Sequence, residues 1–269
     1  YLTRWMHALS RVGIATGSSR YVRWAVELAN AAHTGFVVRP PSGGRARMVW
    51  KMSIDLSRPL VPSMGQHDPV DGLITYHSLR AAMSALSMDG GDLSLEAEID
   101  EIAPIAERAR LVTDDPLGLG GLLLDAHRAA QLQVLGASGS GDGVLEGWPR
   151  SLAGAAVRGL RSYTRTGPFR RPAAYRLAFR ELGLAIGLHA VPLLAGWIAK
   201  HPDRWPEGSH LAARTASLRE HLPLAQRIEA FWLDPDHREV ESWTEHLDIN
   251  RVMLATSLAP DGYLRLAAR

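Results

Sequence analysis

The sequence predicts an all-α protein, for three reasons. Apolar residues recur at spacings of three and four, as in Tyr21, Trp24, Ala25 and Leu28, which is the period of an amphipathic helix. Strand-like alternation is scarce, and turn-forming segments separate the helical stretches. With 46% apolar and 22% charged residues, the chain has a globular composition and can bury a large core. We therefore expect a single helical domain over residues 1–269.

The helical period and its interruptions predict ten helices. Their expected ranges are residues 1–13, 20–34, 47–57, 69–88, 96–110, 117–135, 148–165, 173–199, 209–232 and 238–258. The segment 137–143 is rich in glycine and serine, so we expect a flexible surface loop there.

The composition argues against several kinds of function. Without cysteine, the chain has no disulfide, thiol nucleophile or thiolate metal site. A formal net charge of +2 gives no general attraction to nucleic acid. No Walker A, HExxH, GxSxG or dinucleotide-binding motif occurs in a convincing context. We expect a soluble, cytoplasmic protein without a cofactor, a bound metal or a nucleic-acid partner.

One apolar segment has nearly the length of a membrane-spanning helix. Leu182 to Ala199 carries no formal charge, and about 18 apolar residues suggest a span. His189 and Pro192 interrupt the segment, however, and a buried central helix explains it equally well. We therefore predict a core helix and no membrane partner.

Two similar segments begin helices about 47 residues apart. They are Asp68-Pro69-Val70-Asp71-Gly72-Leu73 and Asp115-Pro116-Leu117-Gly118-Leu119, and their spacing is that of a helical-hairpin repeat. Glycine inside a helix costs about 1 kcal/mol relative to alanine, so helical glycines indicate close approach of neighbouring helices. Such glycines are Gly120, Gly121, Gly154, Gly159, Gly183 and Gly187.

These helical pairs and glycines, with the segments Tyr1-Leu2-Thr3-Arg4-Trp5 and Arg20-Tyr21-Val22-Arg23-Trp24, resemble the six-hairpin (α/α)6 toroid superfamily. That group includes glycosidases and N-acylglucosamine 2-epimerase-like sugar isomerases. The resemblance implies a toroid of helical hairpins whose active site lies at one end, where the starts of the inner helices converge. Because the chain begins at Tyr1 and not at a methionine, it stays open whether the toroid is incomplete at its N-terminus.

The strongest candidate site is the segment of residues 65–72. It places His67, Asp68 and Asp71 at the start of a predicted inner helix, and general acid–base catalysis needs such groups close together with different pKa values. A structural interpretation competes, because an aspartate before a proline is a common helix start. Since Asp115 repeats this step without a histidine, Asp68 alone is predicted to be structural. The functional hypothesis rests mainly on His67 and Asp71.

Neighbouring residues are candidates for contacting a substrate. Asp55 and Arg58 lie three positions apart just before this segment, and a local ion pair is their simplest structural interpretation. In the functional interpretation, Asp55 faces the same cavity as His67. Gln66 and Tyr76 are the other expected substrate-binding residues of this region.

A second polar cluster lies at residues 241–250. In one continuous helix, three carboxylates would share one face, while Trp243, His246 and Asn250 would share another. A stripe of carboxylates is usually a solvated face. A bend just before Asp248 would instead bring His246, Asp248 and Asn250 to the mouth of an inner helix. In a toroid the first and last hairpins meet, which would bring this cluster towards the first one.

Residues 149–180 contain eight arginines with interleaved aromatic residues and no acidic residue. Guanidinium groups bind phosphates and carboxylates in bidentate geometry, and together with aromatic rings they can also contact single-stranded nucleic acid. The structural alternative is a solvated face, or one that pairs with the acidic residues of 96–107. An anionic ligand is therefore one hypothesis for this segment.

A metal site in this chain would need histidine and carboxylate ligands. The step His67-Asp68 is similar to the paired residues of HD phosphohydrolases, with His33 and Asp125 as candidate partners. In that family the pair ends an apolar helix, whereas here it follows a predicted loop. We therefore expect no metal.

Together these features predict a protein that acts on or binds a small sugar. One form of this hypothesis has a negatively charged sugar as the ligand. A carboxylate or histidine would transfer a proton at a sugar carbon or a glycosidic oxygen. The expected catalytic residues are His67, Asp68, Asp71, His246 and Asp248. The expected substrate-binding residues are Asp55, Arg58, Gln66, Tyr76, Trp243 and Asn250. The alternative is a non-catalytic helical scaffold that binds an anionic partner. Oligomeric state, and the choice between hydrolysis and epimerisation, stay open.

Overall fold

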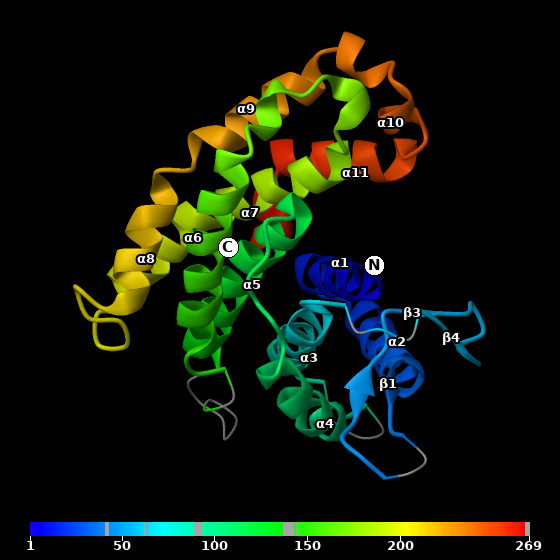
Figure 1. Cartoon of the computed structure of the whole chain (residues 1–269). Coiled ribbons are helices and arrows are strands. Elements are labelled where there is room, and N and C mark those ends of the chain that lie inside the picture. Colours follow the sequence, from blue (N-terminus) through cyan, green and yellow to red (C-terminus); the bar gives the residue numbers. More distant parts are fainter. Residues whose placement is uncertain are drawn as a thin grey trace. The chain divides into compact units, whose positions relative to one another are not determined.

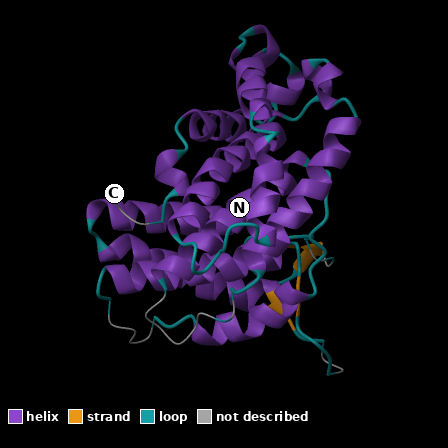
Figure 2. Cartoon of the chain, turned by 90° about the vertical axis from the view of Figure 1, so that its left-hand side faces the viewer, coloured by secondary structure: helices purple, strands orange, loops and turns teal. Residues whose placement is uncertain are grey.

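The computed structural model describes residues 1–40, 43–61, 63, 65–88, 93–136, 143 and 145–266. Most of these residues are helical, and the few strands are short (Figure 1; Figure 2), which confirms the predicted all-α class. Contacts within the chain divide it into two compact units. The first unit holds residues 1–110, 134–144 and 265–269, and the second unit holds residues 111–133 and 145–264. The single domain and the toroidal arrangement stay predictions. The predicted loop at 137–143, apart from Gly143, lies outside the described residues.

The described part of the first unit holds four helices, three of which pack around the fourth, α3. They are α1 (Leu2–Thr16), α2 (Ser19–Phe36), α3 (Asp68–Ala85) and α4 (Glu96–Glu107). α1 packs against α2 and α3, and α3 packs against α4. The short connection between α1 and α2 depends on Gly17, which ends α1 in the left-handed conformation at φ 66°. A residue with a Cβ atom would be strained at this position.

α1 and α2 bury one face each, whereas α3 is buried on nearly all sides. Met6 of α1 and Val22 of α2 are buried, while Trp5 and Trp24 on the same two helices are exposed. Every residue of α3 from 72 to 79 is buried. α3 is therefore the central helix of the first unit, and its N-terminal turn carries the candidate site.

Residues 47–57, predicted to be helical, form parts of two β-hairpins. β1 (Val37–Val38) pairs antiparallel with β2 (Arg47–Met48). β3 (Lys51–Met52) pairs antiparallel with β4 (Pro59–Val61). The helix prediction is wrong here, because the segment forms the short strands β2 and β3, of which β3 packs against α2.

The turn between β3 and β4 shows why a helix does not form. The carboxyl group of Asp55 accepts hydrogen bonds from the hydroxyl of Ser53 at 2.6 Å and from the hydroxyl of Ser57 at 2.8 Å. The N–H of Arg58 donates to the hydroxyl of Ser53 at 3.1 Å. Such local side-chain bonds offer the backbone an alternative to the helical hydrogen-bond pattern.

The second unit contains α-helices of 4 to 23 residues, and short 3-10 helices lie in two of the connections. Its α-helices are α5 (Pro116–Leu135, of which the last two residues belong to the first unit), α6 (Trp148–Arg165), α7 (Ala178–Lys200), α8 (His210–Arg219), α9 (Pro223–Leu233), α10 (Glu241–Thr244), α11 (Leu247–Leu258) and α12 (Asp261–Leu264). Its 3-10 helices are η1 (Pro168–Arg170), η2 (Ala173–Tyr175) and η3 (Asp236–Arg238). α6 packs against α8.

α7 is the core helix of the second unit. By length and composition it could cross a membrane, and 56% of its most apolar 18-residue window is buried within the protein. α8, α9 and α11 pack against it. This packing agrees with the core helix predicted for Leu182 to Ala199.

Glycines bring α5 and α7 into backbone contact. A Cβ atom on Gly120 would lie 2.0 Å from the carbonyl oxygen of Gly183, and one on Gly187 would lie 2.5 Å from the carbonyl oxygen of Gly120. A Cβ atom on Gly159 of α6 would lie 2.1 Å from the carbonyl oxygen of Thr113. No side chain fits at such distances. The close approach predicted for these glycines is confirmed.

Three predicted helices differ from the structure by more than a few residues at their ends, because two of them divide and one begins later. The range 209–232 divides into α8 and α9, because Pro223 cannot continue a helix but fits the first turn of α9. The range 173–199 begins with η2, and α7 itself begins at Ala178. The range 238–258 divides into α10 and α11.

The break between α10 and α11 falls at Glu245 and His246, two residues before the predicted bend at Asp248. The side-chain amide of Asn250 is fully buried and donates a hydrogen bond to the carbonyl oxygen of Trp243 at 2.9 Å. Carbonyl groups at a helix end lack partners within the helix, so this bond stabilises the end of α10.

Candidate functional site

α3 begins at Asp68, directly after a loop. His67 is the N-cap residue, and its side chain makes no capping hydrogen bond. Asp68 is therefore not the N-cap that the Asp-Pro sequence suggests. Asp115, in contrast, does cap α5, because its Oδ1 accepts a hydrogen bond from the N–H of Gly118 at 3.0 Å. The two Asp-Pro steps have different roles, and capping does not explain Asp68.

The carboxyl group of Asp68 lies against Gly65. A Cβ atom on Gly65 would stand 1.8 Å from Oδ2 of Asp68 and 3.1 Å from Cδ1 of Trp50. Since both atoms lie near this one point, the carboxyl group and the indole are neighbours. The N–H of Trp50 donates to the carbonyl oxygen of Ser63 at 2.9 Å. Trp50 is 59% exposed, so an aromatic surface that is open to solvent lies beside the carboxyl group.

Asp71 is the second carboxylate of the same helical turn. Residues three positions apart lie on the same side of a helix, so Asp71 is close to Asp68. Oδ1 of Asp71 lies 3.5 Å from Nη1 of Arg4 on α1. The Asp71 side chain is 13% exposed and that of Arg4 is 36% exposed, so this ion pair is only partly screened by water.

The two carboxyl groups have different electrostatic surroundings. The pKa of Asp68 is raised above its ordinary value, because the surrounding atoms remove water from its carboxyl group and because Asp71 repels a second negative charge. The charges of the Tyr1 amino group and, after it, of Arg4 oppose this rise only in part. Asp68 as a whole residue is nevertheless exposed, so solvent limits this loss of water around its carboxyl group. This turn therefore holds one carboxyl group that retains its proton to higher pH and one that is paired with a cation, the kind of difference that acid–base catalysis uses.

The remaining predicted residues around α3 differ in exposure. His67 is partly exposed and Gln66 is exposed, both in the loop before α3. Tyr76 is only 3% exposed, and its ring centre lies 5.8 Å from that of His33. Burial, and secondly the charge of Glu98, raise the pKa of Tyr76. Tyr76 is thus a core residue, and the structure gives it no surface on which a sugar could pack.

Asp55 and Arg58 lie on the exposed β3–β4 hairpin. Asp55 accepts a third hydrogen bond from the N–H of Ser57 at 3.2 Å, and the two serine hydroxyls and this N–H lower the pKa of Asp55 to about 2. Within the described residues no ion pair joins Asp55 to Arg58, so the local ion pair that the sequence suggests is not found. The turn itself explains why an aspartate occupies position 55.

The second cluster surrounds the break between α10 and α11. His246 is exposed, and its ring meets that of Phe179 edge to face at 5.3 Å. Asp248 is exposed in the first turn of α11. Trp243 is only 3% exposed and stacks on Trp232 at 5.6 Å. Trp243 is therefore held rigidly and is not an open platform.

The predicted catalytic residues fall into two groups. His67, Asp68 and Asp71 lie within one stretch of the first unit, and His246 and Asp248 lie together in the second unit. That the two groups form one site stays a prediction.

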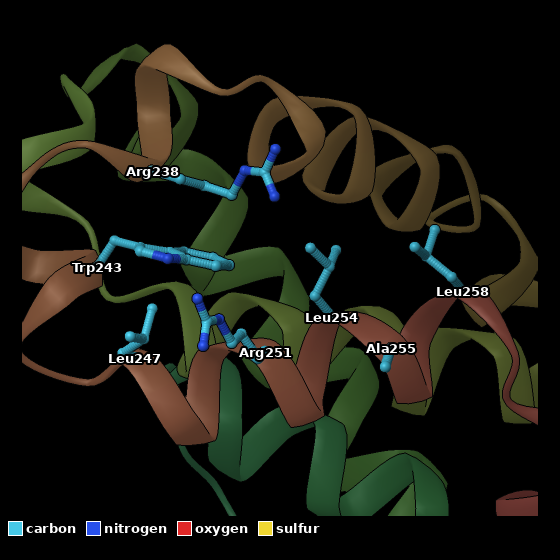
Figure 3. A pocket seen from close by; sticks show the side chains of 7 residues that line it. All are labelled: Arg238, Trp243, Leu247, Arg251, Leu254, Ala255 and Leu258. Carbon is cyan, nitrogen blue, oxygen red and sulfur yellow. The ribbon is translucent and has the colours of Figure 1, made fainter.

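A pocket of about 420 Å³ lies beside Trp243 in the second unit (Figure 3). Its lining residues are Arg238, Trp243, Leu247, Arg251, Leu254, Ala255 and Leu258. Of these, sequence reasoning identified only Trp243. The leucines recur on α11 at spacings of seven and four, which is the period of one helical face. This spacing is the feature of the sequence that could have indicated the apolar wall of the pocket.

Two arginines of the segment 149–180 form ion pairs inside the second unit. Arg176 is buried, and its Nη2 lies 2.6 Å from Oε2 of Glu181. Arg180 pairs with Asp115. The predicted pairing with the acidic residues of α4 is not found for these two arginines, because α4 carboxylates pair with basic residues of the first unit.

Among the described residues, no group of three or more histidine and acidic side chains is placed to hold a metal ion. Nε2 of His33, a candidate ligand, lies 3.1 Å from Oε2 of Glu101. Asp125, the other candidate, pairs with Arg128 within α5 at 3.3 Å.

Comparison with known proteins finds no family model, no curated protein and no solved structure that matches this chain. Its function has to be inferred from the chemistry of its own residues.

Proposed function

We propose that the protein is a carbohydrate-active enzyme whose reaction takes place at Asp68, Asp71, Arg4 and Trp50, together called the Asp68 site. The reaction is a proton transfer at a sugar carbon or at a glycosidic oxygen, as in a sugar epimerase or a glycosidase. One observation carries the proposal: a single helical turn holds a carboxyl group with a raised pKa beside a carboxylate that is paired with an arginine. The resemblance to the six-hairpin toroids supports the same class.

Asp68 is the proposed general acid. A carboxylic acid can protonate a leaving oxygen only if it still holds its proton at the working pH, which requires a raised pKa. Loss of water around the carboxyl group and the charge of Asp71 both act in this direction. In glycoside hydrolysis, the proton of Asp68 moves to the glycosidic oxygen while the electron pair of the breaking C–O bond moves to the leaving alcohol.

Asp71 is the proposed general base. In hydrolysis it accepts a proton from the water that attacks the anomeric carbon, and in epimerisation it accepts the proton of a sugar carbon next to a carbonyl group. Arg4, 3.5 Å from Asp71, pairs with the carboxylate and holds it in place before this step. After turnover, Asp71 returns its proton to solvent and Asp68 takes one up, which restores the starting state.

Trp50 is the proposed platform for the sugar ring. Its indole is 59% exposed and lies beside the Asp68 carboxyl group, because both approach Gly65. The C–H face of a sugar packs on an aromatic ring while its hydroxyl groups stay in contact with water. A ring bound there lies within reach of the acid.

Proton NMR in D2O tests the proposal for both reactions. In a panel of aryl glycosides and free hexoses, hydrolysis produces new anomeric signals, and epimerisation replaces a C–H signal by C–D. We expect turnover of at least one compound, and a loss of about a hundredfold or more in Asp68→Asn and Asp71→Asn. Asp100→Asn, which removes an exposed carboxylate of α4, is the matched control and should keep full activity. Full activity in Asp68→Asn would refute the role of this site.

The exposed arginines of α6 favour a second candidate function, a non-catalytic scaffold with an anionic partner. Arg158, Arg161 and Arg165 are exposed at helical spacing. None of the three forms an ion pair with a described acidic residue. Guanidinium groups without partners on one face attract sulfate, phosphate and carboxylate groups.

Binding to heparin, a sulfated polyanion, tests the scaffold function. We expect the affinity to fall with added salt, and to fall at least tenfold when all three arginines are replaced by glutamine. An affinity that is independent of salt would count against this function.

A further inference from the structure

The pocket beside Trp243, called the Trp243 pocket, combines a cationic end with an apolar end. Figure 3 shows the indole of Trp243 between the side chains of Arg238 and Arg251, with Leu254 and Leu258 further along. The volume of the pocket, about 420 Å³, lies in the range of sites that bind small molecules. The residues come from η3, from α10 and from α11, so the break between α10 and α11 shapes the pocket.

The wall at the cationic end is rigid. Trp243 stacks on the buried Trp232 at 5.6 Å, with 26° between the ring planes. Its carbonyl oxygen accepts the hydrogen bond from Asn250, and the guanidinium carbon of Arg238 lies 6.0 Å from its ring centre. A preformed wall of this kind loses little conformational entropy when a ligand binds.

Arg238 and Arg251 have no carboxylate partner among the described residues. Four acidic residues lie close to them in the sequence, namely Glu239, Glu241, Glu245 and Asp248. None of the four forms an ion pair with either arginine. Nη2 of Arg238 donates to the carbonyl oxygen of Leu233 at 3.2 Å, which orients the guanidinium group. Its Nε is shielded from solvent and has no described hydrogen-bond partner, so the group retains an unused donor.

The other end of the pocket is apolar and long. Leu254, Ala255 and Leu258 line it, and Leu258 is 50% exposed although it is a large apolar side chain. From Arg251 to Leu258 the α11 helix rises about 10 Å. A ligand that reaches along this face therefore needs an alkyl chain of medium length.

We propose that the Trp243 pocket binds a medium-chain carboxylate, with its head group at the two arginines and its alkyl chain along α11. A guanidinium group matches a carboxylate in bidentate geometry, and the leucines shield the chain from water. The nearby acidic residues reduce the local positive potential, which favours a singly charged carboxylate over a dianionic phosphate. This site lies in the second unit and does not depend on the activity proposed for Asp68.

Isothermal titration of the full chain with octanoate tests this proposal. Octanol has the same chain without the charge, and acetate has the charge without the chain. We expect octanoate to bind at least tenfold more tightly than either compound. Octyl phosphate, the dianionic analogue, should bind more weakly than octanoate. Added salt should weaken the binding of octanoate but not that of octanol.

Variants at the pocket separate the two ends. Arg251→Gln removes an exposed guanidinium group, and Leu258→Ser removes an exposed apolar wall. Each should lower the octanoate affinity about tenfold, and Leu258→Ser should not affect acetate. Arg204→Gln, at an exposed arginine outside the pocket, is the control. Because Arg251 and Leu258 are exposed, folding should be preserved, which circular dichroism checks.

Three outcomes would overturn the proposal. Octanol could bind as tightly as octanoate, octyl phosphate could bind more tightly, or the Arg251→Gln and Leu258→Ser variants could bind octanoate like the unmodified chain. The first and second would contradict carboxylate recognition, and the third would place the binding elsewhere.

Discussion

Oδ2 of Asp68 lies 1.8 Å from the position that a Cβ atom on Gly65 would occupy, so the carboxyl group fills the space of a missing side chain. Gly65→Ala must displace this carboxyl group, because non-bonded heavy atoms do not approach so closely. We expect turnover at the Asp68 site to fall at least about tenfold, since catalysis depends on the placement of the acid. The NMR assay described for the sugar panel measures this loss.

Gly44→Ala is the matched control for this substitution. A Cβ atom on Gly44 would come no closer than 3.5 Å to Pro40, which is an ordinary contact. Activity and melting temperature should stay unchanged in this variant. If Gly65→Ala were as active as Gly44→Ala, the position of Asp68 would not matter for turnover.

Asp68→Asn should stabilise the fold at neutral pH while it abolishes activity. The folded pKa of Asp68 is raised, so the unfolded chain loses this proton at lower pH than the folded chain does. The contribution of Asp68 to the free energy of unfolding is therefore greatest at a pH below the pKa that Asp68 has in the unfolded chain. This contribution is lost as pH rises through the pKa that Asp68 has in the folded chain. The variant lacks this loss, so its melting temperature should exceed that of the unmodified chain at pH 7, and the gain should shrink towards pH 3. A gain that is independent of pH would contradict this origin.

Much of the helical fold is predictable from periodicity, but not the segments where side chains bond to nearby backbone. α6 has the predicted bounds, 148–165, because its apolar period and its flanking glycines agree. Residues 47–57 are not helical, because Asp55 bonds to Ser53 and Ser57. These hydrogen bonds depend on the conformation of the turn, and the spacing of apolar residues does not predict them.

The candidate sites show a similar limit. Asp68 and Asp115 both precede proline, and only the structure shows that Asp115 caps its helix while Asp68 lies against Gly65. Arg238 and Arg251 are thirteen positions apart in the sequence. They line one pocket because the chain turns between α10 and α11, and the continuous helix expected for 238–258 hides that relationship.

His77 makes the stability of the fold sensitive to acid. It is 4% exposed, and burial, followed by the charge of Arg80, lowers its pKa from 6.5 to about 4. The unfolded chain therefore binds this proton more readily than the folded chain does. The contribution of His77 to the free energy of unfolding is complete above about pH 6.5 and is lost as pH falls towards 4. The loss is on the order of 3 kcal/mol. Urea unfolding from pH 8 to pH 4 should show this loss in the unmodified chain and not in His77→Gln. Parallel curves for the two proteins would exclude His77 as the cause.

Gly120→Ala should destabilise the second unit strongly, because the new methyl group would lie 2.0 Å from the carbonyl oxygen of Gly183. The obstacle is backbone and not a flexible side chain, so α5 and α7 must separate. Overpacking of this kind costs about 1–3 kcal/mol or more, which exceeds the gain of about 1 kcal/mol from helix propensity. Gly196→Ala, on the same α7 helix, meets nothing within 4 Å and should raise stability by up to about 1 kcal/mol. Thermal unfolding of the two variants should therefore shift in opposite directions, and equal shifts would show that the α5–α7 contact does not depend on glycine.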